Sequence, residues 1–153
     1  MDKVQQLRFL IKIAEREGIS ELTNQLKPLD LTPSQSEVLQ ILAEKEPLSL
    51  KEIGNLIICE KNFPSRLVQK LVDKGLVFKS IAKEDSRKSV LHLTKSGREL
   101  IPLLQEKESE FNQKVWTQFD SENRIDTVID ILNYYLEGSD GLEKLKKRID
   151  EGE

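Results

Sequence analysis

Apolar residues along most of this 153-residue chain recur three or four positions apart, and the spacing changes between residues 76 and 94. Helical spacing of this kind places apolar side chains on one face of a helix. It predicts helices over about residues 4–26, from Pro33, from Ser49, over about 62–74, from Thr94 or Ser96, and from about 121 to Gly138. Glycine and proline are scarce, with 7 and 5 residues, which disfavours a fold of many tight turns. The chain is expected to be mainly helical and long enough for one sizeable core.

Two of the predicted helix starts carry capping residues, and a third is marked by a proline. Thr32 suits an N-cap, and Pro33 suits the first helical position after it. Ser49 and Glu52 have the three-residue spacing of a capping box. Pro64 fits only the first turn of a helix, so the next helix is expected to start just before it. Three short helices are therefore predicted between residues 32 and 74.

The stretch from residue 76 to residue 94 has the pattern of a β-hairpin. Residues 76–81 and 90–94 are typical of strands, and the charged stretch 82–89 lies between them. Three short helices followed by a hairpin form a winged helix-turn-helix, whose third helix fits a DNA major groove. The predicted fold class is therefore mainly α with a small β-hairpin, with additional helices at both ends.

Composition excludes several classes of function. The single cysteine and single histidine rule out an internal disulfide framework and most metal-site or triad chemistry. A Gly-rich phosphate loop and paired catalytic carboxylates are also missing, so we expect no enzyme, no cofactor and no metal. No apolar run approaches the length of a membrane helix, and the N-terminus lacks a signal-peptide pattern. A cytoplasmic protein is expected.

Charge is distributed unevenly along the chain. The net charge is −3, yet residues 49–98 contain 11 basic and 5 acidic residues, a local charge of +6. The remaining residues carry −9. A basic centre between acidic ends is typical of a nucleic-acid-binding segment on a solubilising scaffold. Double-stranded DNA is the expected partner.

The predicted third helix and the hairpin loop supply the candidate DNA contacts. Arg suits guanine edges, Asn and Gln suit adenine, and Ser and Lys suit phosphates. On the outward face of the helix these residues are Asn62, Ser65, Arg66, Gln69 and Lys70. In the loop they are Lys83, Arg87 and Lys88, which would lie along the backbone or in a minor groove.

Roughly residues 5–137 resemble the MarR family of bacterial transcriptional regulators. Asp85-Ser86-Arg87, followed by five residues and then Leu93-Thr94, fits the family's wing signature D-x-R-x5-L-T. Residues 93–98 fit its L-T-x-x-G-R helix entry, residues 31–39 its second helix, and residues 66–77 its recognition helix and the run into the wing. Phe63 and Pro64 stand where the family often has small or β-branched residues.

The resemblance implies a homodimer on a pseudo-palindromic operator, and we expect a repressor that responds to a small-molecule effector. In the family the wing arginine enters the minor groove and a nearby aspartate orients it, roles that fall to Arg87 and Asp85. The expected organisation is one MarR-like chain over residues 1–153. It has a DNA-binding lobe at 30–98, dimerisation helices at 1–29 and 99–137, and a charged tail at 138–153.

Alternatives stay open at several positions. The winged helix could serve protein–protein contact without binding DNA. Cys59 could sense peroxide, as cysteines do in some members of the family, but a small buried structural role is expected because Glu60 is its neighbour. His92 is expected to point away from the face that holds Leu91 and Leu93.

Overall fold

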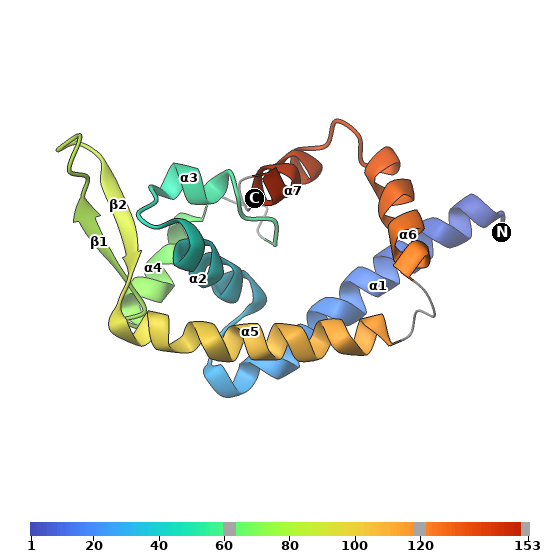
Figure 1. The fold of residues 1–153 in the computed structure, drawn as a ribbon, viewed down its shortest axis with the longest axis horizontal. Coiled ribbons are helices and arrows are strands. Elements are labelled where there is room, and N and C mark those ends of the chain that lie inside the picture. The colour runs from blue at the N-terminus through green and yellow to red at the C-terminus, as the bar shows by residue number, and fades with distance from the viewer. Residues whose placement is uncertain (60–63, 118–121, 151–153) are drawn as a thin grey trace.

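The computed structural model describes residues 1–59, 64–117 and 122–150. In chain order the elements are α1 (Lys3–Leu26), the 3-10 turn η1 (Lys27–Leu29), α2 (Pro33–Lys45), α3 (Leu50–Gly54), α4 (Ser65–Asp73), β1 (Val77–Ile81), β2 (Ser89–Leu93), α5 (Lys95–Trp116), α6 (Glu122–Tyr135) and α7 (Asp140–Asp150). Helices α2, α3 and α4 and the hairpin lie at one end of the long helix α5, and α6 lies at the other end (Figure 1). The predicted fold class, mainly α with a small β-hairpin, is confirmed.

The predicted capping residues start their helices. The Thr32 hydroxyl accepts the Gln35 backbone N–H at 3.2 Å, and the Gln35 side chain in turn accepts the Thr32 N–H at 3.1 Å. Ser49 and Glu52 form the same reciprocal pair at the start of α3. Each pair satisfies backbone donors that have no partner within the helix. These bonds set where α2 and α3 begin.

Strands β1 and β2 form an antiparallel pair in which Val77 lies opposite Leu93 and Ile81 lies opposite Ser89. Leu48 forms an isolated bridge to Leu91, with N–H to O distances of 3.3 and 2.8 Å. This bridge attaches the hairpin to the segment that precedes α3. The hairpin is therefore anchored at the middle of β2, and its loop extends from the lobe (Figure 1).

The core lies within the winged helix lobe and was largely predicted by the apolar spacing. Val38, Leu39, Ile41 and Leu42 of α2 are each at most 1% exposed. Further core residues are Ile53, Leu56, Ile57, Val68, Leu71, Val77, Leu91, Leu93 and, from α5, Leu104. Burial of these side chains from α2 to α5 in one cluster fixes the orientation of α4 and the hairpin.

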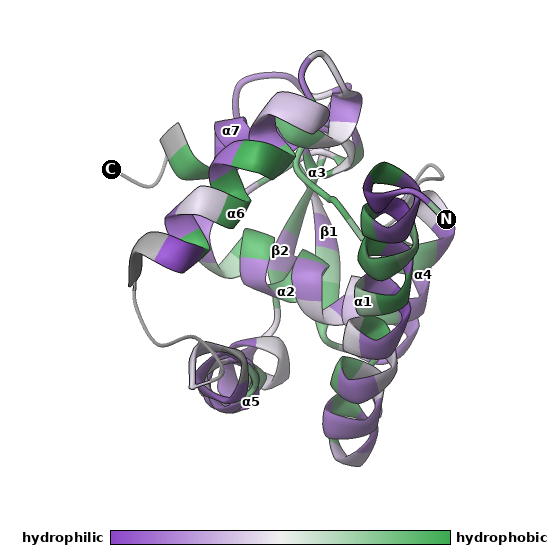
Figure 2. Cartoon of the chain, turned by 90° about the vertical axis from the view of Figure 1, so that its right-hand side faces the viewer, coloured by the Kyte–Doolittle hydropathy of each residue, from purple (hydrophilic) through white to green (hydrophobic). Residues whose placement is uncertain are grey.

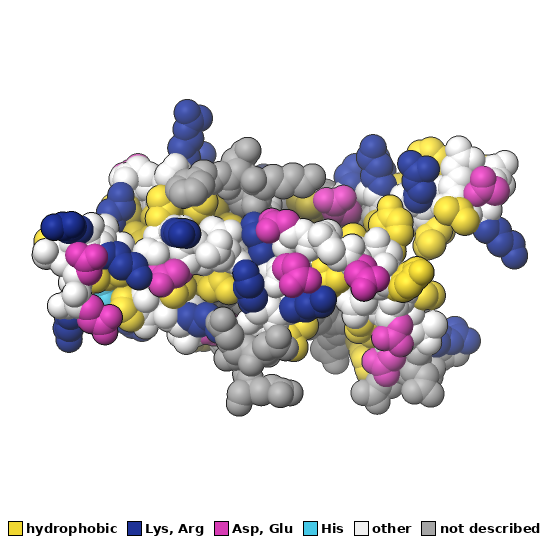
Figure 3. Space-filling view, turned by 90° about the horizontal axis from the view of Figure 1, so that it is seen from above, with side chains coloured by type: hydrophobic (Ala, Val, Ile, Leu, Met, Phe, Trp, Pro, Cys, Tyr) yellow, Lys and Arg dark blue, Asp and Glu magenta, His cyan; other side chains and the backbone are white. Residues whose placement is uncertain are grey.

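Helices α1 and α6 leave much of their apolar surface exposed. On α1 these residues are Val4, Leu7, Phe9, Leu10, Ile13 and Ile19; on α6 they are Val128, Ile129, Ile131, Tyr134 and Tyr135. Figure 2 shows hydrophobic and hydrophilic residues alternating along both helices. Figure 3 shows hydrophobic side chains exposed at the end of the molecule opposite the hairpin. In the single chain, these apolar stripes on α1 and α6 are exposed to solvent.

Residues 140–150 of the expected charged tail form a helix, α7. Ser139 caps α7 by accepting the Leu142 N–H at 3.2 Å, and Lys144 pairs with Asp140 at 3.3 Å. Leu142 is 5% exposed. Arg148 forms an ion pair with Glu37 of α2, so α7 contacts the lobe rather than trailing from it.

Candidate nucleic-acid interface

Helix α4 presents polar side chains on one face and buries apolar ones on the other. Val68 is 1% exposed and Leu71 is fully buried, so both face the core. Four of the predicted contact residues are exposed on the remaining surface: Ser65, Arg66, Gln69 and Lys70. The fifth, Asn62, lies outside the described residues. The predicted start of the helix just before Pro64 is wrong, because α4 begins at Ser65 and Pro64 is its N-cap.

The side chain of Gln69 is already engaged in hydrogen bonds. Its amide N–H donates to Asp73 Oδ1 at 2.9 Å, and its carbonyl Oε1 accepts from Lys79 Nζ at 3.1 Å. Lys79 lies on β1 and was not among the predicted contacts. Because β1 directly follows α4, its outward positions lie beside the exposed face of the helix. The short connection between α4 and β1 is therefore the sequence signal that could have placed Lys79 on the same surface as Gln69.

All four predicted wing residues, Lys83, Asp85, Arg87 and Lys88, are exposed on the hairpin loop. The Asp85 carboxylate accepts the backbone N–H of Arg87 at 2.9 Å, which makes an Asx turn. The loop is closed by the Ala82 N–H bond to the Lys88 carbonyl at 2.8 Å. Within the described part of the chain, the Arg87 guanidinium has no hydrogen-bonding or ionic partner. Asp85 thus orders the backbone of the wing and leaves the Arg87 side chain free.

Lys88 is held by a carboxylate of α3. Its Nζ lies 3.1 Å from Glu52 Oε1, so this ion pair ties the wing to the helix-turn-helix. Bonds from Ser49 and from Lys88 hold the pKa of the Glu52 carboxyl down at about 2. Accepting these bonds favours the charged form of the acid. One carboxylate therefore caps α3 and anchors the wing.

The end of the wing is joined to α5 by the residues of the L-T-x-x-G-R segment. The Thr94 hydroxyl donates to the Gly75 carbonyl at 2.7 Å and accepts the Gly97 N–H at 3.0 Å. A Cβ at Gly97 would lie 2.2 Å from the backbone oxygen of Leu76, so the close approach there requires glycine. Leu93 at the start of this segment is 2% exposed.

Arg98, the last residue of that segment, pairs with Glu46. The other oxygen of Glu46 accepts the Leu93 N–H at 2.6 Å. Glu46 follows α2, so this pair joins the end of α2 to the start of α5. The four specified residues of the L-T-x-x-G-R segment therefore fix the wing to the lobe through contacts within the protein.

His92 lies opposite Phe78 on the hairpin, and the two rings stack with their centroids 5.0 Å apart. Its Nε2 lies 2.8 Å from the Ser80 hydroxyl. Leu91 and Leu93, on either side, are buried, so His92 points to the other face as expected. Its contacts give it a structural role on the strand.

The expectation of a buried Cys59 is wrong, because the residue is exposed. Its backbone N–H donates to Glu37 at 2.8 Å. Partial burial of the thiol, together with the charge and hydrogen bonding of Glu37, raises the pKa of Cys59 to about 12. A thiol that stays protonated at neutral pH is a poor nucleophile.

Among residues 1–59, 64–117 and 122–150, no three His, Cys, Asp or Glu side chains are grouped so as to hold a metal ion. In the same part of the chain, every helix is too short or too polar to cross a membrane. Lys and Arg side chains project from the hairpin end, alongside a few acidic ones (Figure 3). The surface formed by α4 and the wing is the candidate interface.

Known regulators resemble this chain in sequence and in fold. The family described as Winged helix DNA-binding domain matches residues 31–97. The HTH-type transcriptional regulator SarZ of Staphylococcus saprophyticus is 30% identical over 126 residues, which cover 82% of each chain. A MarR transcriptional regulator from Methanosarcina mazei superposes with a TM-score of 0.72 at 22% identity, covering 88% of this chain and 96% of that one.

The crystal structure of the S. aureus MepR–DNA complex superposes with a TM-score of 0.76 at 22% identity, covering 84% of this chain and 95% of that one. The similarity to SarZ covers most of both chains, and the fold is shared with the MarR regulator and MepR. Both findings indicate the same family. The chain belongs to the MarR family of winged helix-turn-helix transcriptional regulators.

Proposed function

We propose that this protein is a homodimeric repressor that binds a pseudo-palindromic DNA operator. In this proposal α4 enters the major groove, and the loop between β1 and β2 lies in an adjacent minor groove. The observation that carries it is the set of exposed basic side chains on the outer face of α4 and on the wing of a winged helix. The MepR relative has been crystallised with DNA, and SarZ is a transcriptional regulator.

Each exposed residue has a chemical role in the proposal. Arg66 reads a guanine edge, while Ser65 and Lys70 contact phosphates. Arg87, whose guanidinium is free of protein partners within the described residues, enters the negative potential of the minor groove. Gln69 reads a base only after it releases Asp73 or Lys79, so its contribution is smaller than that of Arg66.

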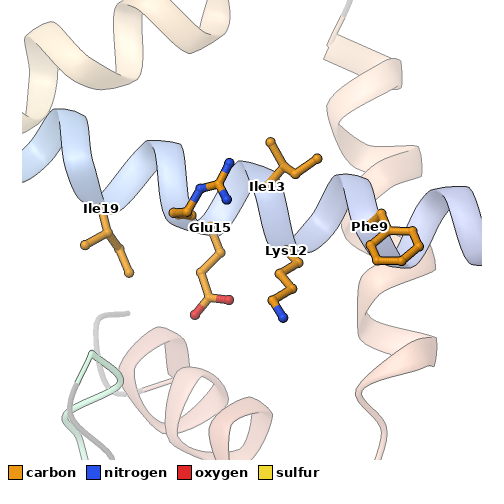
Figure 4. A pocket seen from close by; sticks show the side chains of 6 residues that line it. Phe9, Lys12, Ile13, Glu15 and Ile19 are labelled. Atoms are coloured by element: carbon orange, nitrogen blue, oxygen red, sulfur yellow. The ribbon is translucent and has the colours of Figure 1, made fainter.

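Exposed apolar surface on α1 and α6 supports the homodimer. Large apolar stripes on a water-soluble chain are favourable only when another surface covers them. A hollow of about 530 Å³ runs along α1 and is lined by Phe9, Lys12, Ile13, Glu15, Arg16 and Ile19 (Figure 4). In the proposal, residues 1–29 and 99–137 of two copies pack together, and each copy presents its 30–98 lobe to one operator half-site.

Regulation and place of action complete the proposal. Release of the operator by a small molecule is a property that the resemblance to the MarR family implies. The proposed partner is double-stranded DNA, and the proposed location is the cytoplasm. The proposed function is regulation without catalytic activity.

Binding to DNA from the region upstream of its own gene tests the proposal. Fluorescence anisotropy against the natural sequence and a scrambled duplex, at several salt concentrations, is expected to show specific binding that weakens as salt rises. Footprinting is expected to show two protected half-sites, and sedimentation at micromolar concentration is expected to show a dimer. Absence of specific binding at low salt would favour the alternative, a winged helix used for protein–protein contact.

A further inference from the structure

Helix α7 reaches back to the helix-turn-helix through one side chain. Arg148 Nη1 lies 2.7 Å from Glu37 Oε1, although 111 positions separate the two residues. The Arg148 side chain is 26% exposed and that of Glu37 is 9% exposed. Near the other end of α7, Lys144 pairs with Asp140, whose side chain is 87% exposed. The acidic partner of Arg148 is therefore far more buried than the acidic partner of Lys144. Arg148 therefore differs from an ordinary solvated surface arginine.

Glu37 holds the backbone that leads into the recognition helix. Its Oε1 accepts the Ile58 N–H at 2.9 Å, and its Oε2 accepts the Cys59 N–H at 2.8 Å. Ser34, one turn earlier on α2, contributes a hydroxyl 3.5 Å from the Cys59 carbonyl. These bonds fix the chain to α2 shortly before α4. A buried carboxylate is tolerated only when it is paired and hydrogen-bonded, and Arg148 supplies the positive charge.

We propose that Arg148 is a positioning residue for DNA recognition, which acts through Glu37 to hold the segment that leads into α4. The inference rests on the proposed DNA-binding function. Without Arg148, Glu37 is a nearly buried charge that has no counter-ion among the described residues, and its carboxylate turns toward water and releases Ile58 and Cys59. The backbone at Ile58 and Cys59 then samples several conformations, and DNA must select one of them at a cost in affinity.

Replacement of Arg148 by methionine, which keeps the length of the apolar stem, tests the proposal. Lys147→Met is the matched control, because Lys147 is the exposed neighbouring cation on the same helix. Arg148→Met is expected to weaken binding to the natural upstream DNA roughly tenfold, with the salt slope unchanged because no phosphate contact is lost. Lys147→Met is expected to change affinity less than twofold. Arg148→Lys, which keeps the charge, is expected to restore most of the loss.

Removal of the charge at Glu37 gives a second, independent readout. Glu37→Gln alone is expected to weaken binding, because its amide nitrogen cannot accept one of the Ile58 and Cys59 N–H groups, and adding Arg148→Met to it is expected to cost less affinity than Arg148→Met costs in the parent, since no unpaired charge is left. Unchanged affinity in Arg148→Met, or a salt slope lower by about one unit, would overturn the proposal. The lower slope would show that Arg148 contacts phosphate directly.

Hydrogen exchange in the free protein separates this inference from the proposed function. Arg148→Met is expected to speed exchange of the Ile58 and Cys59 amides at least tenfold, while the amides of Leu39 and Leu42 in α2 stay protected. Equal acceleration at all four amides would mean general destabilisation and would overturn the positioning role. If the parent protein binds no DNA but the Ile58 and Cys59 amides respond as expected, the link to this segment stands and the DNA-binding function fails.

Discussion

The sharpest test of the packing between wing and α5 is Gly97→Ala. The added Cβ would lie 2.2 Å from the Leu76 backbone oxygen and 3.3 Å from Leu93 Cδ2. The first of these neighbours is backbone and cannot turn aside as a side chain can. The same oxygen also accepts the Thr94 N–H at 3.0 Å. Relief of the clash therefore disturbs the connection between β2 and α5.

The magnitude follows from three contributions to the free energy of unfolding. Overpacking costs about 1–3 kcal/mol, and a rigid backbone neighbour places Gly97→Ala near the upper value. Loss of the Thr94 hydrogen bond adds about 1 kcal/mol. The better helix propensity of alanine offsets up to about 1 kcal/mol of this loss of stability. The net expected loss is about 3 kcal/mol, which lowers the melting temperature of a chain of this size by roughly 6–12 °C.

Urea and thermal unfolding at one fixed protein concentration measure this effect, because dimerisation would make the midpoint concentration-dependent. Gly18→Ala is the matched control, since Gly18 lies within α1 and its added Cβ would be 3.9 Å from Phe111 Cζ, an ordinary contact. That variant is expected to gain up to about 1 kcal/mol. A Gly97→Ala protein as stable as the parent would refute the steric explanation of this glycine.

Three further predictions concern charge and the thiol. Glu52→Gln is expected to destabilise the fold by up to about 1 kcal/mol at pH 7 through loss of the ion pair with Lys88, while its amide oxygen keeps the capping bond as Gln35 does at α2. The Glu52 pKa lies at about 2 in the fold, below its usual 4.5, so this stability is present above pH 4.5 and is lost as pH falls toward 2; urea titrations across that range should show a shallower pH dependence in the variant. Asp73→Ala removes an acid beside the proposed phosphate path and frees Gln69, so anisotropy should show roughly 3- to 10-fold tighter DNA binding, and weaker binding would count against placing α4 in the groove. Cys59, with its pKa raised to about 12, is expected to alkylate slowly at pH 7, and Cys59→Ser should leave DNA binding in peroxide unchanged; a peroxide response present in the parent and absent in the variant would contradict this.

Local features of the fold could be predicted because they depend on neighbouring residues. Thr32 caps its helix as the Pro33 that follows it indicates, Ser49 caps its helix as its spacing to Glu52 indicates, and the apolar positions of α2 form the core. The strands pair where the pattern changes period. Such features require only helix or strand geometry, which the sequence displays directly.

Contacts between distant residues could not be predicted in the same way. Lys88 was predicted as a wing contact to DNA, and its ion pair with Glu52, 36 positions earlier, could not be read from the sequence. Asp85 was expected to hold the Arg87 guanidinium, but it bonds the backbone N–H instead. The docking of α7 depends on Arg148 meeting Glu37, which only the tertiary arrangement produces. Periodicity says which face a residue occupies and does not identify its partner across the fold.

The central claim, that α4 reads bases while the wing adds minor-groove affinity, is tested most directly by comparing Arg87→Ala with Arg66→Ala. Both variants and the parent are titrated against operator and scrambled DNA at several salt concentrations. Arg87→Ala is expected to lose roughly 1–3 kcal/mol per site and about one unit of salt slope per wing, with its preference for operator intact. Arg66→Ala is expected to lose that preference. Parental affinity and salt slope in Arg87→Ala, or full operator preference in Arg66→Ala, would contradict the account.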